Sequence, residues 1–220
     1  MKQPCIYCGE REGSHRDHAP PKCFFPEPRP SNLITVPACL VCNGKYGKDD
    51  DQVRNLITSL EDTVEHPAIV TQLGNKRYRS IFRGKGKHKL EEFEKSLIEI
   101  DRFSKTGGYL GKHPAFNFDQ PIMDRFFDRM ARALLYHENS IGYVKCKIEW
   151  NLIRTEDALP KGLRDQLISW GKYGAIGDDI FCYLGLVMPN VVSSFWVLDF
   201  YGGVEFKILV TGVSSLWGHP

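Results

Sequence analysis

The sequence predicts an α+β fold, in which a small metal-stabilised module is followed by a helical segment and then by an antiparallel β-sheet domain. Residues 1–48 are rich in Cys, His, Pro and Gly and lack apolar periodicity, so they need something other than a core to hold them together. Apolar residues then recur at helical spacing, and alternating apolar residues typical of strands follow. We place the metal module at residues 1–60 and an accessory α+β domain of unknown role at residues 61–220.

Three helices and four strands are expected from these patterns. An acidic run at residues 49–51 suits the first turn of one helix. Asp119 and Pro121 mark the start of the longest one. Residues 201–204, Tyr-Gly-Gly-Val, predict a tight hairpin turn. The expected helices cover residues 49–60, 90–103 and 120–138, and the expected strands cover residues 143–152, 181–188, 194–201 and 204–211.

The composition is that of an ordinary globular protein. The 220 residues are 42% hydrophobic, 12% aromatic and 25% charged, which is sufficient to build a core. The net charge is only +2, so any affinity for nucleic acid has to come from local clusters. The N-terminus lacks the apolar segment of a signal peptide, and polar residues interrupt the most apolar stretch, residues 181–200. We therefore expect a soluble, cytoplasmic protein.

Four of the seven cysteines form two Cys-x-x-Cys pairs, Cys5/Cys8 and Cys39/Cys42. Two intervening residues let both sulfurs of a pair reach one ion, and two such pairs complete a tetrahedral zinc site. Without a secretory signal, metal is favoured over disulfides, and the strand-to-helix context of a redox motif is missing near the N-terminus. Four thiolates leave no open coordination position, so this zinc is expected to be structural. Gly9 would permit the left-handed backbone that follows the first pair.

Residues with the chemistry of phosphodiester hydrolysis lie between and beside these pairs. Residues 15–22 read His-Arg-Asp-His-Ala-Pro-Pro-Lys, and Asn43 directly follows the last cysteine of the pairs. The imidazole of His18 can accept a proton from water near neutral pH. The carboxylate of Asp17 and the amide of Asn43 offer hard oxygen ligands suited to Mg²⁺ or Mn²⁺. Zinc that links residue 8 to residue 39 would bring these groups close together.

The order of these motifs resembles the HNH endonuclease family over residues 5–55. The shared parts are Cys-x-x-Cys, then Asp-His-x-x-Pro, then Asn-Leu, and finally Val-Pro-x-Cys-x-x-Cys-Asn. The resemblance implies a treble-clef-like ββα-metal module, in which a two-stranded hairpin and a helix hold one divalent metal. It also implies a nuclease that cleaves DNA in preference to RNA and leaves 5′-phosphate and 3′-hydroxyl ends.

Roles for four residues follow from this resemblance. It implies that His18 is the general base and that Asp17 and Asn43 are metal ligands. It further implies that Asn32 fixes the loop between the strands and orients the base. Many family members have histidine at the position of Asn43.

The position of the acid and the base raises a geometric difficulty. Neighbouring residues of a regular strand point to opposite faces, whereas Asp17 and His18 have to approach one phosphate. We therefore expect the backbone to leave ideal strand geometry near Pro20 and Pro21. His15 would share the side of Asp17 in a regular strand, and it is the rival ligand or base.

Two groups of basic residues lie further along the chain. One is a run without acids, which could follow a nucleic-acid backbone or could be a solvated loop. The other comprises Arg125, Arg129 and Arg132 on the polar face of the longest expected helix, where Asp128 can pair with Arg132. We interpret that face as solvent-exposed. The residues of the first group are Lys76, Arg77, Arg79, Arg83, Lys85, Lys87 and Lys89.

Two functions from different classes follow. The first is a metal-dependent endonuclease that acts on nucleic acid. Its biological role could be that of an antiphage-defence or toxin effector. A double-strand break would then require a homodimer or two events, and a regulatory partner protein could control it. The second is a non-catalytic zinc module that binds nucleic acid or a protein. Asp17 and His18 discriminate between them, because a binding module does not need an acid–base pair.

Overall fold

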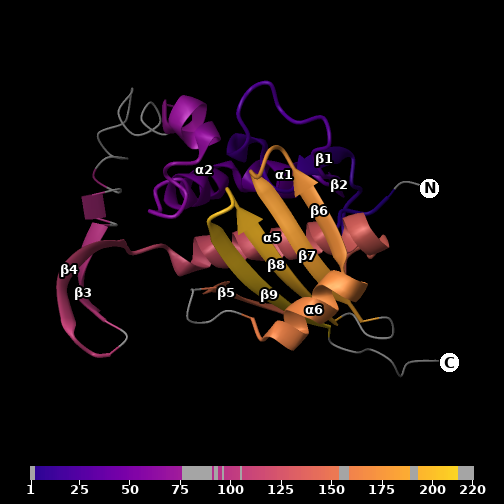
Figure 1. The fold of residues 1–220 in the computed structure, drawn as a ribbon. Helices are drawn as coiled ribbons and strands as arrows, with labels where there is room; N and C mark the ends of the chain where they lie inside the picture. Colours follow the sequence, from indigo (N-terminus) through magenta and orange to yellow (C-terminus); the bar gives the residue numbers. More distant parts are fainter. Residues whose placement is uncertain are drawn as a thin grey trace.

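The computed structural model describes residues 3–75, 91, 94–95, 97–104, 106–153, 159–188 and 193–212. Within these residues the chain is an α+β structure with a five-stranded antiparallel sheet and a long helix, α5 (Gln120–Asn139). Figure 1 shows α5 running behind the sheet, with the N-terminal segment above it. The expected order of a cysteine-rich module, helices and an antiparallel sheet is confirmed at this level.

The N-terminal segment forms a two-stranded hairpin followed by two helices. These elements are β1 (His15–His18), β2 (Thr35–Ala38), α1 (Leu40–Lys45) and α2 (Gly47–Ile57). β1 and β2 are antiparallel and regular in register, with Asp17 opposite Val36 and His18 opposite Thr35. α2 confirms the helix expected from the acidic run, and the acids in its first turn suit the positive end of the helix dipole.

The sheet has the strand order β5-β9-β8-β7-β6, and all neighbouring strands are antiparallel. Four of these strands were expected, whereas β6 and the helix before it, α6 (Lys161–Trp170), were not. The expected hairpin turn joins β8 to β9, with φ angles of 58° at Tyr201 and 62° at Gly202. The strands are β5 (Cys146–Ile153), β6 (Lys172–Ile176), β7 (Phe181–Val187), β8 (Ser193–Phe200) and β9 (Val204–Gly212).

α5 connects the two parts of the molecule. It begins after Asp119 with a proline in its first turn, as expected, and ends at Ser140, whose φ of 56° is left-handed. It packs against β2 and α2 of the N-terminal segment and against β5 and β9 of the sheet. Neither α5 nor any other helix in the described part of the chain combines the length and apolarity needed to cross a membrane.

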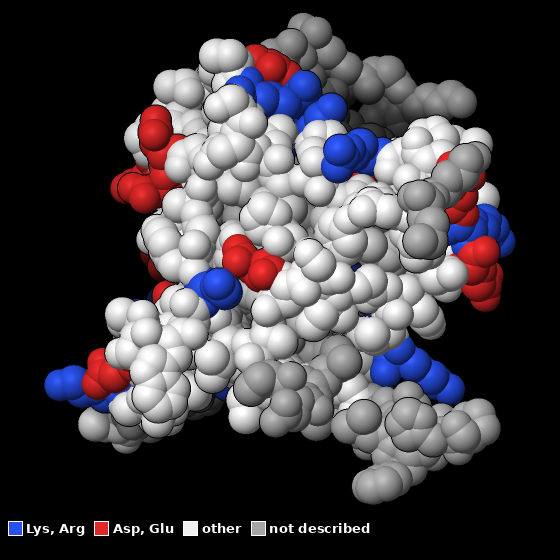
Figure 2. Space-filling model, turned by 90° about the vertical axis from the view of Figure 1, so that its right-hand side faces the viewer, with Lys and Arg blue, Asp and Glu red and all other residues white. Residues whose placement is uncertain are grey.

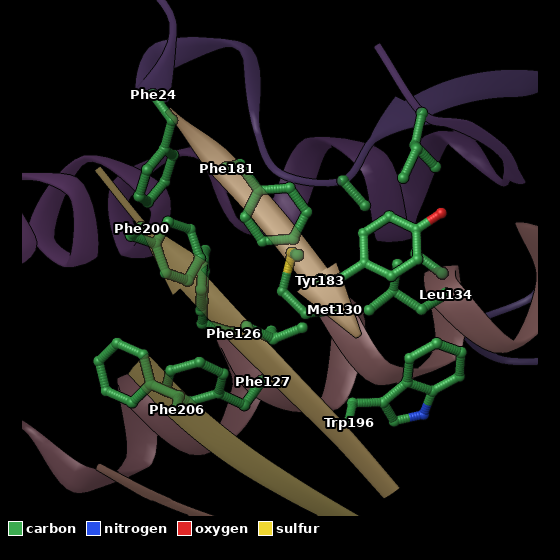
Figure 3. Packing of buried hydrophobic residues seen from close by; sticks show 14 of the residues in the cluster. Phe24, Phe126, Phe127, Met130, Leu134, Phe181, Tyr183, Trp196, Phe200 and Phe206 are labelled. Atoms are coloured by element: carbon green, nitrogen blue, oxygen red, sulfur yellow. The ribbon is translucent and has the colours of Figure 1, made fainter. Parts of the chain in front are cut away.

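Buried aromatic side chains from the N-terminal segment, from α5 and from the sheet meet in the core (Figure 3). Phe24, which follows β1 in the chain, has its ring centroid 5.6 Å from that of Phe126 on α5 and 5.4 Å from that of Phe200 on β8. One continuous cluster of buried residues extends from Ile6 to Val210. The hydrophobic core therefore crosses the domain boundary that we place near residue 60, and that boundary stays a prediction.

The expectation of a helix at residues 90–103 is wrong for residues 97–103. Residues 97–103 form strand β3 (Leu97–Phe103), which pairs with β4 (Tyr109–Phe116). The β-branched Ile98 and Ile100 favour a strand, and the Gly107-Gly108 turn, where Gly107 has a φ of 86°, lets the chain fold back. Figure 1 shows this hairpin extending away from the sheet. Local pairing therefore outweighed the helical spacing of the apolar residues.

Candidate metal centre and adjoining acid–histidine site

The four cysteines of the two pairs converge on one point. The sulfur atoms of Cys5, Cys8, Cys39 and Cys42 all lie within 4.8 Å of one another. Sulfurs around a tetrahedral zinc at about 2.3 Å are separated by about 3.8 Å, so the cluster fits a structural zinc with only small adjustments. All seven cysteines lie in the described part of the chain, and none forms a disulfide. The three remaining cysteines do not belong to this cluster.

The first pair sits in a tight turn at the N-terminus. The Gly9 N–H donates to the Cys5 carbonyl at 2.8 Å, and Gly9 has a φ of 68°. The expected left-handed glycine is therefore confirmed. A side chain at this position would also collide with Tyr143, because a Cβ on Gly9 would lie 2.6 Å from Cδ1 of that ring. Conformation and packing both require glycine here.

The second pair lies at the start of α1. Cys39 is the N-cap residue, and its sulfur accepts a hydrogen bond from the Cys42 N–H at 3.4 Å. The pKa of the Cys39 thiol is lowered: burial alone would raise it, but this N–H and the neighbouring Arg11 side chain outweigh burial. Both effects favour the thiolate, which is the form that binds metal.

Asp17 lies next to this centre in a buried network of charged and polar groups. The residue as a whole is only 8% exposed. Oδ2 accepts hydrogen bonds from the Tyr7 hydroxyl at 2.8 Å and from Arg129 Nη2 at 3.2 Å. Oδ1 accepts one from the backbone N–H of His18 at 2.9 Å. Burial, and then the charge of Asp17, raise the pKa of Tyr7 well above its usual value, so the phenol keeps the proton that it donates.

Arg129 corrects our interpretation of the polar face of α5. We expected a solvent-exposed face, but Arg129 is only 6% exposed and binds Asp50 through Nη1 at 2.6 Å as well as Asp17. Arg125 pairs with Asp49 at 2.7 Å. The expected pair of Asp128 with Arg132 is present, at 2.9 Å. α5 therefore supplies cations to the acidic start of α2, a complementarity visible in the sequence as arginines four residues apart and a run of aspartates.

His18 is half-buried at the end of β1. Its pKa is lowered from the usual value by burial and then by the nearby positive charge of Lys22. The β1–β2 register is regular through His18, and the chain leaves strand geometry only after it, where β1 ends and the Ala19–Pro20 peptide bond is cis. The side chains of Asp17 and His18 therefore lie on opposite faces of the hairpin. His15, the rival, is exposed, and its Nδ1 lies 3.0 Å from Ser14 Oγ.

The two asparagines lie in different surroundings. Asn43 is in α1, which packs against β1, so it comes from the element next to Asp17 and His18. Asn32 is exposed, and its Nδ2 donates to the carbonyl of Ala175 on β6 at 2.9 Å. That contact ties the loop between β1 and β2 to the sheet. The basic run from Lys76 to Lys89 lies outside the described residues.

A pocket of about 600 Å³ lies beside the site, between α5 and β5. Tyr46, which separates α1 from α2, and Trp150 are among the residues that line it. Three carboxylates and one arginine line it: Asp124, Asp128, Glu149 and Arg125. The excess of acids makes it a poor path for a phosphate backbone. On the face shown in Figure 2, lysines and arginines are scattered between uncharged areas.

Known protein families, curated proteins and solved structures contain no match to this chain.

Proposed function

We propose that this protein is a metal-dependent nuclease of the HNH type that hydrolyses phosphodiester bonds, with DNA as the preferred substrate. One observation carries the proposal. The strand that ends in Asp17 and His18 pairs with β2, and β2 leads through Cys39 directly into the helix that bears Asn43. That helix packs back against β1, so acid, imidazole and amide come from adjoining elements of a single cysteine-braced unit.

The hydrogen bonds of Asp17 leave one acceptor position unused, which supports the proposal of a metal ligand. A carboxylate has about four acceptor positions, two on each oxygen. Oδ2 uses both of its positions for Tyr7 and Arg129, and Oδ1 uses one for the His18 N–H. One position on Oδ1 is left, which suits a single bond to a divalent cation. The Asn43 amide would add a second oxygen ligand, so the donors fit the hard Mg²⁺ or Mn²⁺.

The residues divide the chemistry between them. A bound Mg²⁺ or Mn²⁺ would supply positive charge for the phosphate and the leaving oxygen. His18 would accept a proton from the attacking water. Among the described strands β1 has β2 as its single partner, so its other edge is not paired with a strand. We infer that the phosphate binds along this edge, where Asp17 from one face and His18 from the other act on the same substrate.

Cleavage of DNA by matched histidine variants tests the proposal. Purified full-length protein is incubated with plasmid and single-stranded DNA in Mg²⁺ or Mn²⁺, next to His18→Ala and His15→Ala. His15 is the matched control, because it is a histidine on the same strand but exposed. We expect His18→Ala to lose about 10²–10⁴-fold in rate, the usual contribution of a general base, and His15→Ala to retain the rate of the unmodified protein. Equal cleavage by all three proteins would exclude His18 as the base.

A second function, a non-catalytic zinc module, is favoured by two features. The three hydrogen bonds of Asp17 are also what a purely structural carboxylate would make, and the tip of the second cysteine pair exposes Leu40 and Val41, which are 66% and 56% accessible. Such a module would hold zinc and lack a second metal site. Binding of Mn²⁺ that depends on Asp17 therefore separates the two functions.

A further inference from the structure

Arg129 reaches the candidate site from α5, outside the segment that carries the motifs of the site. It lies 112 residues after Asp17 in the sequence, and its Nη2 contacts Asp17 Oδ2 at 3.2 Å. Its Nη1 contacts Asp50 Oδ1 at 2.6 Å. The guanidinium also lies over the ring of Tyr46, with 4.5 Å from Cζ to the ring centroid. Three elements, β1, α2 and the α1–α2 junction, thus meet around one side chain.

Folding stability alone is a weak explanation for this arrangement. Burying an arginine between two carboxylates removes three charges from water, and their attraction often does no more than offset that cost. Arg129 Nε adds to the cost, because it is buried and has no hydrogen-bond partner among the described residues. Apolar residues of similar volume frequently stabilise such a position better. A role for the charge and the fork shape of the guanidinium is therefore indicated.

We propose that Arg129, together with Tyr7, is a positioning residue that presents Asp17 to the divalent metal through Oδ1 alone. The inference rests on the proposed function, because it assigns Asp17 as a metal ligand. The two donors occupy Oδ2 completely. Asp50 holds the other arm of the guanidinium, so Arg129 cannot rotate away from Asp17 without losing a second ion pair. Hydrogen bonds of this kind orient carboxylate ligands and raise metal affinity.

The test uses two charge-balanced double variants of the full-length, zinc-loaded protein. The first combines Arg129→Gln with Asp50→Asn, which removes the hold on Asp17 without leaving Asp50 as an unpaired buried charge. The control combines Arg125→Gln with Asp49→Asn. That pair joins the same two helices through the same chemistry, with 2.7 Å between Arg125 Nε and Asp49 Oδ2, and this ion pair does not involve Asp17. Tyr7→Phe is a third variant that removes one Oδ2 donor and no charge.

Binding of Mn²⁺ is measured by electron paramagnetic resonance titration, with zinc content and circular dichroism recorded for each protein. We expect the Arg129/Asp50 variant to bind Mn²⁺ about 10–100-fold more weakly, as loss of an outer partner of a metal ligand usually does. Tyr7→Phe should weaken binding in the same direction, and the Arg125/Asp49 control should bind like the unmodified protein. If the Arg129/Asp50 variant does not retain its fold, Tyr7→Phe decides.

The outcomes separate this inference from the proposed function. Unchanged or tighter Mn²⁺ binding by the Arg129/Asp50 variant or by Tyr7→Phe would overturn the positioning role, because a guanidinium that merely competes with the metal predicts tighter binding. Equal weakening by the control would also overturn it, since the effect would then belong to helix packing in general. Asp17→Asn tests the proposed function itself. If this variant binds Mn²⁺ as well as the unmodified protein, the assignment of Asp17 as a metal ligand fails, whatever the role of Arg129.

Discussion

A buried carboxylate oxygen on β8 introduces a pH dependence into folding. Oδ1 of Asp199 is buried and has no hydrogen-bond partner among the described residues. Burial, followed by the negative charge of Glu205 directly opposite on β9, raises the pKa of Asp199 to about 6. The folded protein therefore binds this proton more tightly than the unfolded chain does. The protonated form of Asp199 stabilises the fold, and the ionised form is tolerated at a cost.

We expect Asp199→Asn to increase the free energy of unfolding at pH 7 and to have little effect at pH 4. Because the folded-state pKa is raised, the favourable contribution of Asp199 is complete below the unfolded pKa of about 4 and is lost as the pH rises through about 6. The gain at pH 7 should be about 1 kcal/mol, since solvent screens this partly exposed group. Urea denaturation at both pH values measures it.

Asp178, which is exposed in the turn between β6 and β7, provides the control for this prediction. Asp178→Asn should change the free energy of unfolding by less than about 0.5 kcal/mol at either pH, as surface substitutions usually do. If Asp199→Asn has no higher free energy of unfolding than the unmodified protein at pH 7, the buried Oδ1 does not titrate as described. Hydration of the carboxylate would then have to compensate for its burial.

At the scale of elements, the sequence was most informative where a long pattern and its end signals agreed. α5 has both: Asp119 and Pro121 at its start and an apolar stripe along its length. The strands of the sheet have alternating apolar residues, and β7, β8 and β9 were predicted to within one or two residues. β3 is different, because both of its faces are exposed and its apolar residues do not mark a buried side. Periodicity carries information only when one face is buried.

Close packing of β7 on β8 depends on a glycine that periodicity does not identify. Gly185 lies opposite Trp196 in the sheet, and a Cβ at Gly185 would lie 1.9 Å from Cε3 of that ring. Trp196 is fully buried, so it cannot move without disturbing the core. We expect Gly185→Ala to lower the free energy of unfolding by about 1–3 kcal/mol, the usual cost of overpacking. Chemical denaturation measures this loss.

Gly162→Ala is the matched control for Gly185→Ala. Gly162 lies in α6, and a Cβ there would have no atom within 4 Å. Alanine is the better helix former, by up to about 1 kcal/mol, so this variant should be as stable as the unmodified protein or slightly more so. Equal stability of both variants would show that the Trp196 ring can shift at little cost.

At the scale of the whole molecule, the parts of the site that are close in sequence were predictable and the remote parts were not. The cysteine spacing predicted a four-sulfur cluster, and the cluster forms. Arg129 is 112 residues from Asp17. The sequence shows the arginines of α5 and the aspartates of α2, but nothing local to α5 shows that the two groups meet or that Asp17 joins them. The same holds for the contact between Asn32 and Ala175, which spans 143 residues. Such partners follow from the packing of α5 and the sheet.

The continuous core gives the four-cysteine cluster an effect beyond the N-terminal segment. Ile6, Phe24, Phe25 and Val36 belong to the same buried cluster as the side chains of α5 and the sheet. Disorder near the cysteines would therefore expose apolar surface on α5 as well. The 60-residue module and the remaining chain should accordingly unfold together, even though their sequences differ in character.

We expect Cys8→Ser to abolish zinc binding and to lower the melting temperature of the entire molecule in one transition. Structural zinc contributes about 10–16 kcal/mol in small peptides, so a loss of at least about 5 kcal/mol is expected here, equivalent to roughly 10–20 °C for a chain of this size. Metal analysis and differential scanning calorimetry measure both effects. Cys146→Ser is the control, because Cys146 lies on β5 outside the sulfur cluster, and it should retain zinc. Two transitions, with the upper one unchanged by Cys8→Ser, would instead show that the sheet folds independently of the metal and that the boundary near residue 60 separates true domains.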